Sequence, residues 1–135
     1  MLSEDKMKNV ANVIACLSPG TQTNSQVLII NDKRVLLKDT DNIGDKRFVF
    51  SSVFTVNRTE VNDYDAYIFC VKSALPEFFI FTRKQLISYI DLYKRDRRVV
   101  GFYMGRTTNG SLLDYKDNQM IDLSKFYNNW NVLSV

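Results

Sequence analysis

The sequence predicts an α/β or α+β domain in which helices flank a central mixed β-sheet. Apolar runs of strand length cluster in the middle of the chain, and segments with helical periodicity lie before and after them. No repeat, linker or low-complexity segment interrupts this order. With 135 residues, 45% of them hydrophobic and 24% charged, the chain has the size and composition of one globular domain covering residues 1–135.

The first expected elements are a helix and a β-hairpin. Ser3 is a good helix N-cap, and apolar residues then recur at helical spacing until Pro19-Gly20. After this stop, residues 27–30 form an apolar strand that turns through Asn31-Asp32 into a second strand over residues 34–37.

Three further strands are expected in the middle of the chain, over residues 47–54, 64–71 and 77–81. The near-continuous apolarity of the last two indicates central strands that are covered on both faces. Thr82 and Gln85 have the spacing of a capping box, which predicts a helix from Thr82 to Lys94.

The remainder of the chain predicts a hairpin and a closing helix. Residues 99–104 and 112–121 are expected to pair through a turn at Asn109-Gly110, because this dipeptide adopts the positive φ values that tight hairpins need. Apolar residues between Leu123 and Leu133 then recur at helical spacing.

Composition restricts the chemistry. The chain has no histidine, and its two cysteines, Cys16 and Cys70, lie in separate apolar runs. Zinc sites and histidine-based catalysis are therefore excluded, and both thiols are expected to be buried packing residues. Catalysis would have to use carboxylate, lysine, hydroxyl or a bound metal.

The acidic amino terminus predicts no secretory leader, and no apolar run is long enough to span a membrane. We therefore expect a cytoplasmic protein without a membrane partner. The net charge is only +3, but cations are clustered along the chain. The candidate nucleic-acid-binding residues are Lys33, Arg34, Lys94, Arg95, Arg97 and Arg98. An equally good interpretation is that Lys94 and Arg95 complement the negative end of the preceding helix.

Two places combine lysine with carboxylates. Lys38 lies beside Asp39 and Asp41 at the end of the predicted hairpin, which is typical of a phosphodiester-cleaving site and equally of a polar strand end. Asp114 and Lys116 form a second acid-x-Lys triplet and are the alternative catalytic candidates.

The order of elements, with the hairpin ending at Lys38 and the run Asn62–Phe69 followed by a strand and the Thr82 helix, resembles the PD-(D/E)XK nuclease superfamily. The resemblance implies a restriction-endonuclease-like fold, with Glu4 as the acid of the leading helix and Lys38 as the motif lysine. Leucine occupies the position of the motif glutamate, and Asn24 that of the metal-binding aspartate. A Mg²⁺ site would therefore need migrated ligands, and the candidate ligands are Asp32, Asp39, Asp41 and Glu4.

The resemblance thus implies a Mg²⁺-dependent nuclease or a catalytically degenerate domain that binds nucleic acid, with DNA as the expected partner. Nucleases of this kind often cut as homodimers. The alternative hypothesis is a non-enzymatic protein-interaction module, such as an inhibitor or an immunity-type protein. A small RNA-cleaving toxin is a third hypothesis.

Overall fold

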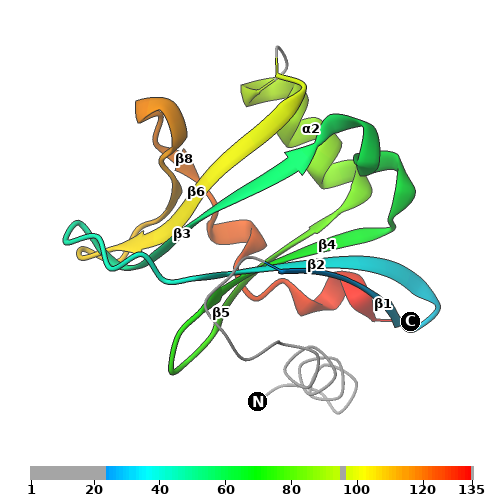
Figure 1. Ribbon diagram of the computed structural model, residues 1–135, viewed down its shortest axis with the longest axis horizontal. Helices are drawn as coiled ribbons and strands as arrows, with labels where there is room; N and C mark the ends of the chain where they lie inside the picture. Colours follow the sequence, from blue (N-terminus) through cyan, green and yellow to red (C-terminus); the bar gives the residue numbers. More distant parts are fainter. Residues whose placement is uncertain (1–23, 95–96, 135) are drawn as a thin grey trace.

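The computed structural model describes residues 24–94 and 97–134, and this part of the chain contains two four-stranded sheets and one α-helix, α2 (Arg83–Tyr93). Sheet A has the order β1 (Asn24–Ile30), β2 (Lys33–Asp41), β4 (Ala66–Lys72), β5 (Glu77–Thr82). Sheet B has the order β3 (Phe48–Asn57), β6 (Val99–Thr107), β7 (Leu112–Asp114), β8 (Ile121–Asp122). The 3₁₀ turns are η1 (Arg58–Asp63), η2 (Lys116–Asn118), η3 (Ser124–Phe126) and η4 (Trp130–Leu133). Figure 1 shows the long β3–β6 ribbon above sheet A. The predicted α+β class is confirmed.

Sheet A is the mixed sheet. Its β1–β2 hairpin turns through Asn31 and Asp32, whose φ values of 50° and 64° are those of a two-residue hairpin turn, as the sequence predicts. β2 runs parallel to β4, and β5 runs antiparallel to β4. The carboxyl ends of β2 and β4 therefore meet at the same edge of the sheet.

Sheet B is antiparallel throughout and takes up β3, so the chain has a second sheet beside the mixed one. The predicted hairpin after β6 is confirmed, and Gly110 adopts a φ of +95° in its turn. The prediction of one strand over residues 112–121 is wrong. The Asp114 carboxylate accepts a hydrogen bond from the Lys116 backbone N–H (3.1 Å), and the chain turns there into η2 between β7 and β8.

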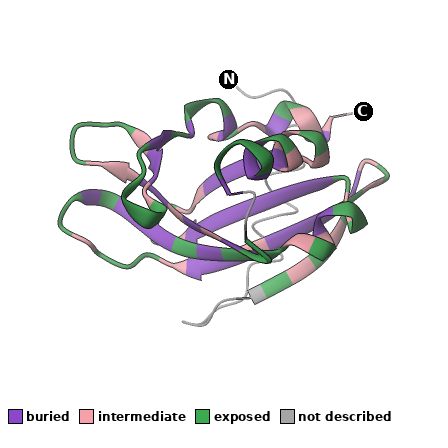
Figure 2. Ribbon diagram, turned by 90° about the horizontal axis from the view of Figure 1, so that it is seen from above, coloured by how far each residue is buried: buried purple, intermediate pink, exposed green. Residues whose placement is uncertain are grey.

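α2 confirms the predicted helix and its capping box. The Thr82 hydroxyl accepts from the Gln85 N–H (3.0 Å), and the Gln85 side chain accepts from the Thr82 N–H (2.9 Å). The buried face of the helix, formed by Leu86, Tyr89 and Ile90, belongs to an aromatic core between the sheets. Figure 2 shows buried residues running through the strands of both sheets. None of the described helices is long and apolar enough to cross a membrane.

A second cluster of buried residues covers the other face of sheet A, as expected for β4 and β5. Trp130 and Leu133 of η4 belong to it, and the Trp130 ring lies 5.0 Å from that of Phe78. The predicted closing helix is wrong, because η3 and η4 are single 3₁₀ turns. Asn128 interrupts the helix with a φ of 52° and donates its N–H to the carbonyl of Phe78 (3.0 Å), so the chain docks on β5.

Two sequence predictions concern the beginning of the chain and the cysteines. Cys70 is a buried free thiol, as predicted, whereas Cys16 and the predicted leading helix lie outside the described residues. β1 forms one edge of sheet A and carries no charged residue. Its Val27 and Ile29 side chains are 50% and 69% exposed, which is unusual for an edge strand.

Candidate functional site

The predicted ligands Asp39 and Asp41 lie at the carboxyl ends of the parallel strands β2 and β4, together with Lys72. The Lys72 ammonium lies 3.3 Å from Asp39 Oδ1 and 3.7 Å from Asp41 Oδ1. Ends of parallel strands are common ligand sites in α/β sheets. The sequence prediction did not include Lys72, because only the parallel pairing of β2 with β4 brings it to the two carboxylates.

Asp39 is the most unusual member of this cluster. It is fully buried, and neither carboxylate oxygen accepts a hydrogen bond from a described residue. Its register partner in β4 is Cys70, and burial together with the Asp39 charge raises the pKa of the Cys70 thiol to about 12. Burying a carboxylate is costly when its oxygens lack hydrogen-bond donors, so this position is a candidate for a role beyond packing.

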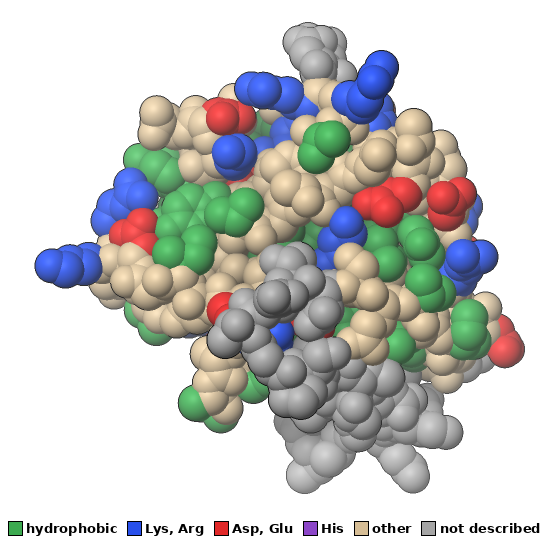
Figure 3. Space-filling model, viewed as in Figure 1, with side chains coloured by type: hydrophobic (Ala, Val, Ile, Leu, Met, Phe, Trp, Pro, Cys, Tyr) green, Lys and Arg blue, Asp and Glu red, His purple; other side chains and the backbone are tan. Residues whose placement is uncertain are grey.

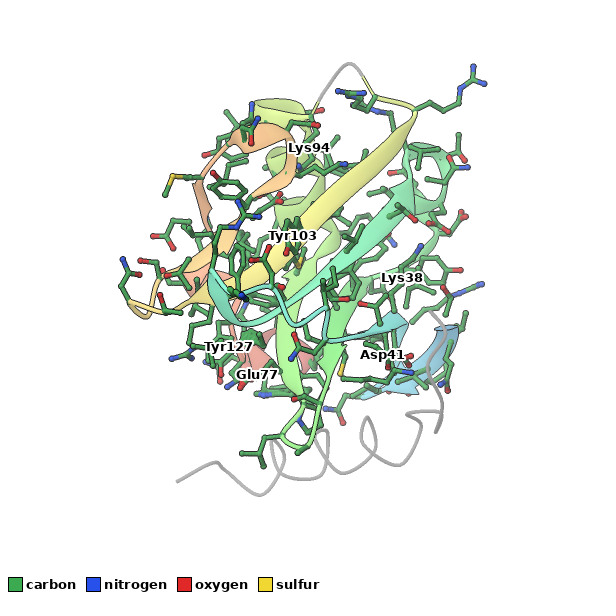
Figure 4. The ribbon with its side chains drawn as sticks, turned by 60° about the vertical axis from the view of Figure 1, so that its left-hand side comes forward. Lys38, Asp41, Glu77, Lys94, Tyr103 and Tyr127 are labelled. Carbon is green, nitrogen blue, oxygen red and sulfur yellow. The ribbon has the colours of Figure 1, made fainter. Side chains whose placement is uncertain are left out.

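The predicted catalytic Lys38 points toward sheet B and away from this cluster. Its ammonium donates to the carbonyl of Thr55 (2.6 Å) and to Glu60 Oε1 (3.0 Å). Glu60 Oε1 also accepts from the Asn57 N–H (3.0 Å) in the capping box of η1. These contacts are those of a structural pair, and Figure 4 shows Lys38 and Asp41 at separate places around β2.

The other predicted metal ligands do not join Asp39 and Asp41 within the described residues. Asp32 lies in the β1–β2 turn, at the far end of the nine-residue β2, roughly 23 Å from Asp39 and roughly 30 Å from Asp41 along the strand. Glu4 lies outside the described residues. Residues 24–94 and 97–134 contain no group of three or more His, Cys, Asp or Glu side chains suited to a metal. Among the described residues, the candidates for holding Mg²⁺ are therefore Asp39 and Asp41. Two carboxylates are enough for this ion when water or phosphate completes its coordination shell.

The alternative pair, Asp114 and Lys116, is arranged differently from the predicted site. One oxygen of the buried Asp114 carboxylate forms an ion pair with the Lys94 ammonium (2.9 Å) and accepts a hydrogen bond from the Tyr89 hydroxyl (2.7 Å). Its other oxygen accepts from the backbone N–H groups of Tyr103 (2.9 Å) and Lys116 (3.1 Å). Burial and the Asp114 charge raise the pKa of Tyr89 far above its usual range. Asp114 is thus the centre of a buried polar network.

The predicted nucleic-acid-binding cations are dispersed. Lys94 is buried with Asp114, and Arg95 lies outside the described residues. Lys33 donates to the carbonyl of Ser134 (3.0 Å), and the Arg34 guanidinium lies 5.1 Å from the Tyr64 ring centre. Arg97 and Arg98 are exposed, and Arg97 lies 3.6 Å from Asp117 in an exposed ion pair.

The sequence prediction missed a group of aromatic and cationic residues on the outer face of sheet B. The Arg47 guanidinium lies 5.7 Å from the Phe48 ring centre and 5.1 Å from that of Tyr115. Asp45 accepts from Arg47 (2.8 Å) and from the Tyr103 hydroxyl (2.8 Å), and these bonds, led by that of Arg47, hold the Asp45 pKa well below its usual range. One sequence signal for this face is the run 101–105, in which two glycines alternate around Tyr103.

A scan of protein-family models, a search of curated proteins and a search of solved structures each found no match to this chain.

Proposed function

We propose that this chain is a nucleic-acid-binding domain and that the outer face of sheet B contacts the nucleic acid. The antiparallel β3–β6 ribbon supports this proposal, because each of its strands follows a pair of cations. Lys46 and Arg47 precede β3, and Arg97 and Arg98 precede β6, so the two pairs lie at opposite ends of the ribbon. Figure 3 shows hydrophobic side chains over β3 and β6, with Lys and Arg side chains toward both ends.

The charge on this face suits a phosphate backbone. Lys116 of η2 adds a cation between the two ends, because its Cε atom lies 3.0 Å from the position of a Cβ on Gly101 in β6. These five cations are accompanied by two acids, Asp45 and Asp117, which leaves a net charge of +3. Cations spread over about 30 Å of strand can contact several consecutive phosphates.

The expected result of a binding titration is an affinity that falls steeply with salt. Fluorescence anisotropy with labelled DNA and RNA oligonucleotides, in EDTA and over a salt series, measures this dependence. The double variant Arg98→Ala/Lys116→Ala should reduce the slope of log K against log salt by about 1 to 2. The matched control Lys84→Ala/Lys125→Ala also removes two exposed cations, but these lie on α2 and η3, outside the strands of sheet B.

A salt-independent affinity, or an equal effect of the control, would remove this surface from the proposal. Absence of binding at low salt, together with capture of one stoichiometric protein partner through β1, would replace it with the protein-interaction alternative. The feature that such a partner could contact is β1, which carries no charged residue and exposes the side chains of Val27 and Ile29.

A second candidate function is phosphodiester cleavage at Asp39, Asp41 and Lys72, within the proposed relationship to PD-(D/E)XK nucleases. The observation that favours it is that Asp39, which accepts no hydrogen bond from a described residue, lies next to a lysine and a second carboxylate. Mg²⁺ held by the two carboxylates would supply an acidic bound water and a counter-charge for phosphate. Lys72 would neutralise charge on the phosphodiester that enters the cluster.

Cleavage is tested by incubating the protein with plasmid DNA and with RNA in Mg²⁺, in Mn²⁺ and in EDTA. Asp41 is only partly buried, so Asp41→Asn should preserve the fold while lowering the rate by about 100-fold or more. Lys38→Ala is the control, because Lys38 contacts Glu60 rather than the cluster, and its rate should stay close to that of the unmodified protein. Inert protein in every metal would remove cleavage and leave the binding function to stand on its own test. Cleavage of RNA alone would favour the toxin hypothesis.

A further inference from the structure

Two hollows border sheet B, and the η2 segment contributes to both. The larger, of about 470 Å³, lies between the end of α2, the start of β6 and η2, and its lining includes Thr55, Tyr93, Arg97, Gly101, Lys116 and Asp117. The smaller, of about 250 Å³, lies over β3 and β6, and its lining includes Arg47, Val53, Tyr103, Tyr115, Lys116 and Asp117. Lys116 and Asp117 therefore belong to both hollows.

The spacing of the hollows follows from the strand register. Thr55 pairs with Gly101 beneath the larger hollow, and Val53 pairs with Tyr103 beneath the smaller one. These pairs are two residues apart on the same face, so they are separated by about 7 Å along the ribbon. This distance is comparable to that between consecutive phosphates of an extended nucleic-acid strand.

Each hollow contains an aromatic side chain and an arginine. Tyr93 is 45% exposed in the larger hollow, where Arg97 lines the same space. In the smaller hollow, Tyr115 lies under the Arg47 guanidinium. An aromatic face beside a guanidinium is suited to a planar base with a nearby phosphate.

The Lys116 ammonium is the cation shared by the two hollows. It forms no ion pair with any described residue, and the side chain extends across Gly101, which leaves room for it. The backbone beneath it is unusual, because Asp117 and Asn118 both have φ values of 60°. The Asp114 carboxylate holds the start of this turn through the Lys116 N–H (3.1 Å).

We propose that the ligand of this face is single-stranded nucleic acid, with two consecutive bases in the two hollows and the phosphate between them at Lys116. This inference rests on the proposed nucleic-acid-binding function and specifies its substrate. In a duplex, the base faces are covered by their stacked neighbours, so Tyr93 and Tyr115 could not stack on them. Phosphates alone would need the cations of this face but not its aromatic residues.

The test measures the affinity of the full chain for a labelled oligothymidine and for a hairpin duplex of equal phosphate number, in EDTA. The single strand is expected to bind more tightly. Tyr93→Ala should weaken its binding about 5- to 150-fold, whereas Tyr93→Phe, which keeps the ring, should change it little. Tyr115→Ala should have an effect of the same size.

Gly101→Ala tests the position of Lys116 without changing any charge. The added methyl group would meet the flexible end of Lys116 at 3.0 Å, so the ammonium must move while the strand stays intact. Single-strand affinity should fall toward that of Lys116→Gln. Lys84→Gln is the charge control, and thermal unfolding of each variant checks that the fold is retained.

The outcomes separate this inference from the function on which it depends. Tighter binding of the single strand, with losses in both tyrosine variants, supports it. Salt-dependent binding that is equal for duplex and single strand, or unchanged in Tyr93→Ala and Tyr115→Ala, would overturn the single-strand inference and leave the nucleic-acid function standing. No binding of either ligand at low salt would overturn both.

Discussion

Replacement of Asp114 by alanine should lower the free energy of unfolding by about 3–5 kcal/mol, because it leaves the charge of Lys94 buried without a counter-ion. Lys94 and Asp114 are both buried, with 2.9 Å between ammonium and carboxylate. The same substitution removes the acceptor of the Tyr89 hydroxyl and of two backbone N–H groups. A loss of this size is a large part of the stability of a typical domain.

Urea denaturation of the two proteins measures the difference, and Asp117→Asn is the control. Asp117 also pairs with a cation, Arg97, but both side chains are more than half exposed, so loss of this pair should cost less than about 1 kcal/mol. Asparagine tolerates the φ of 60° at this position, so the control adds little backbone strain. The double variant Lys94→Met/Asp114→Leu should recover much of the lost stability, because it removes both buried charges. A loss as small as that of Asp117→Asn would show that the Asp114 network contributes little.

The same network connects stability with the proposed binding face. Asp114 accepts hydrogen bonds from the backbone N–H groups of Lys116 and Tyr103. Lys116 lines both hollows, and Tyr103 lines the smaller one. The sequence prediction assigned Asp114 and Lys116 to a catalytic triplet. The structure instead gives Asp114 a buried structural position, from which it places Lys116 at the surface.

Elements with local signals could be predicted from the sequence. The β1–β2 turn needs positive φ at Asn31 and Asp32, and the start of α2 needs the reciprocal bonds of Thr82 and Gln85. Both depend on residues at most three positions apart, so the sequence contains the whole interaction. The apolar runs of strand length likewise indicated the strands before the structure placed them in sheets.

Features that depend on distant pairings could not be predicted in this way. The place of Lys72 beside Asp39 follows from the parallel register of β2 and β4, and the assignment of β3 to a second sheet follows from its pairing with β6. The periodicity between Leu123 and Leu133 predicted a helix, but the contact of Asn128 with β5 replaced it with two 3₁₀ turns. In each case a tertiary contact decided between local conformations that the sequence left open.

Lys72→Ala should cost about 3–5 kcal/mol of unfolding free energy at neutral pH, whereas Asp39→Ala should cost far less or stabilise the protein. Without Lys72, the fully buried Asp39 carboxylate loses the ammonium at 3.3 Å, and no described residue donates a hydrogen bond to either oxygen to compensate. Removing Asp39 itself eliminates the buried charge, and Lys72 keeps the half-buried Asp41 at 3.7 Å.

Urea denaturation of both variants and of the unmodified protein at neutral pH gives the comparison. The double variant Asp39→Ala/Lys72→Ala should be more stable than Lys72→Ala alone, since the buried charge is gone. Equal losses in the two single variants would mean that Asp39 contributes to folding like an ordinary paired residue, and this would count against a functional role for it. If Asp39→Ala raises the free energy of unfolding and abolishes cleavage, Asp39 is a functional carboxylate that lowers the stability of the fold.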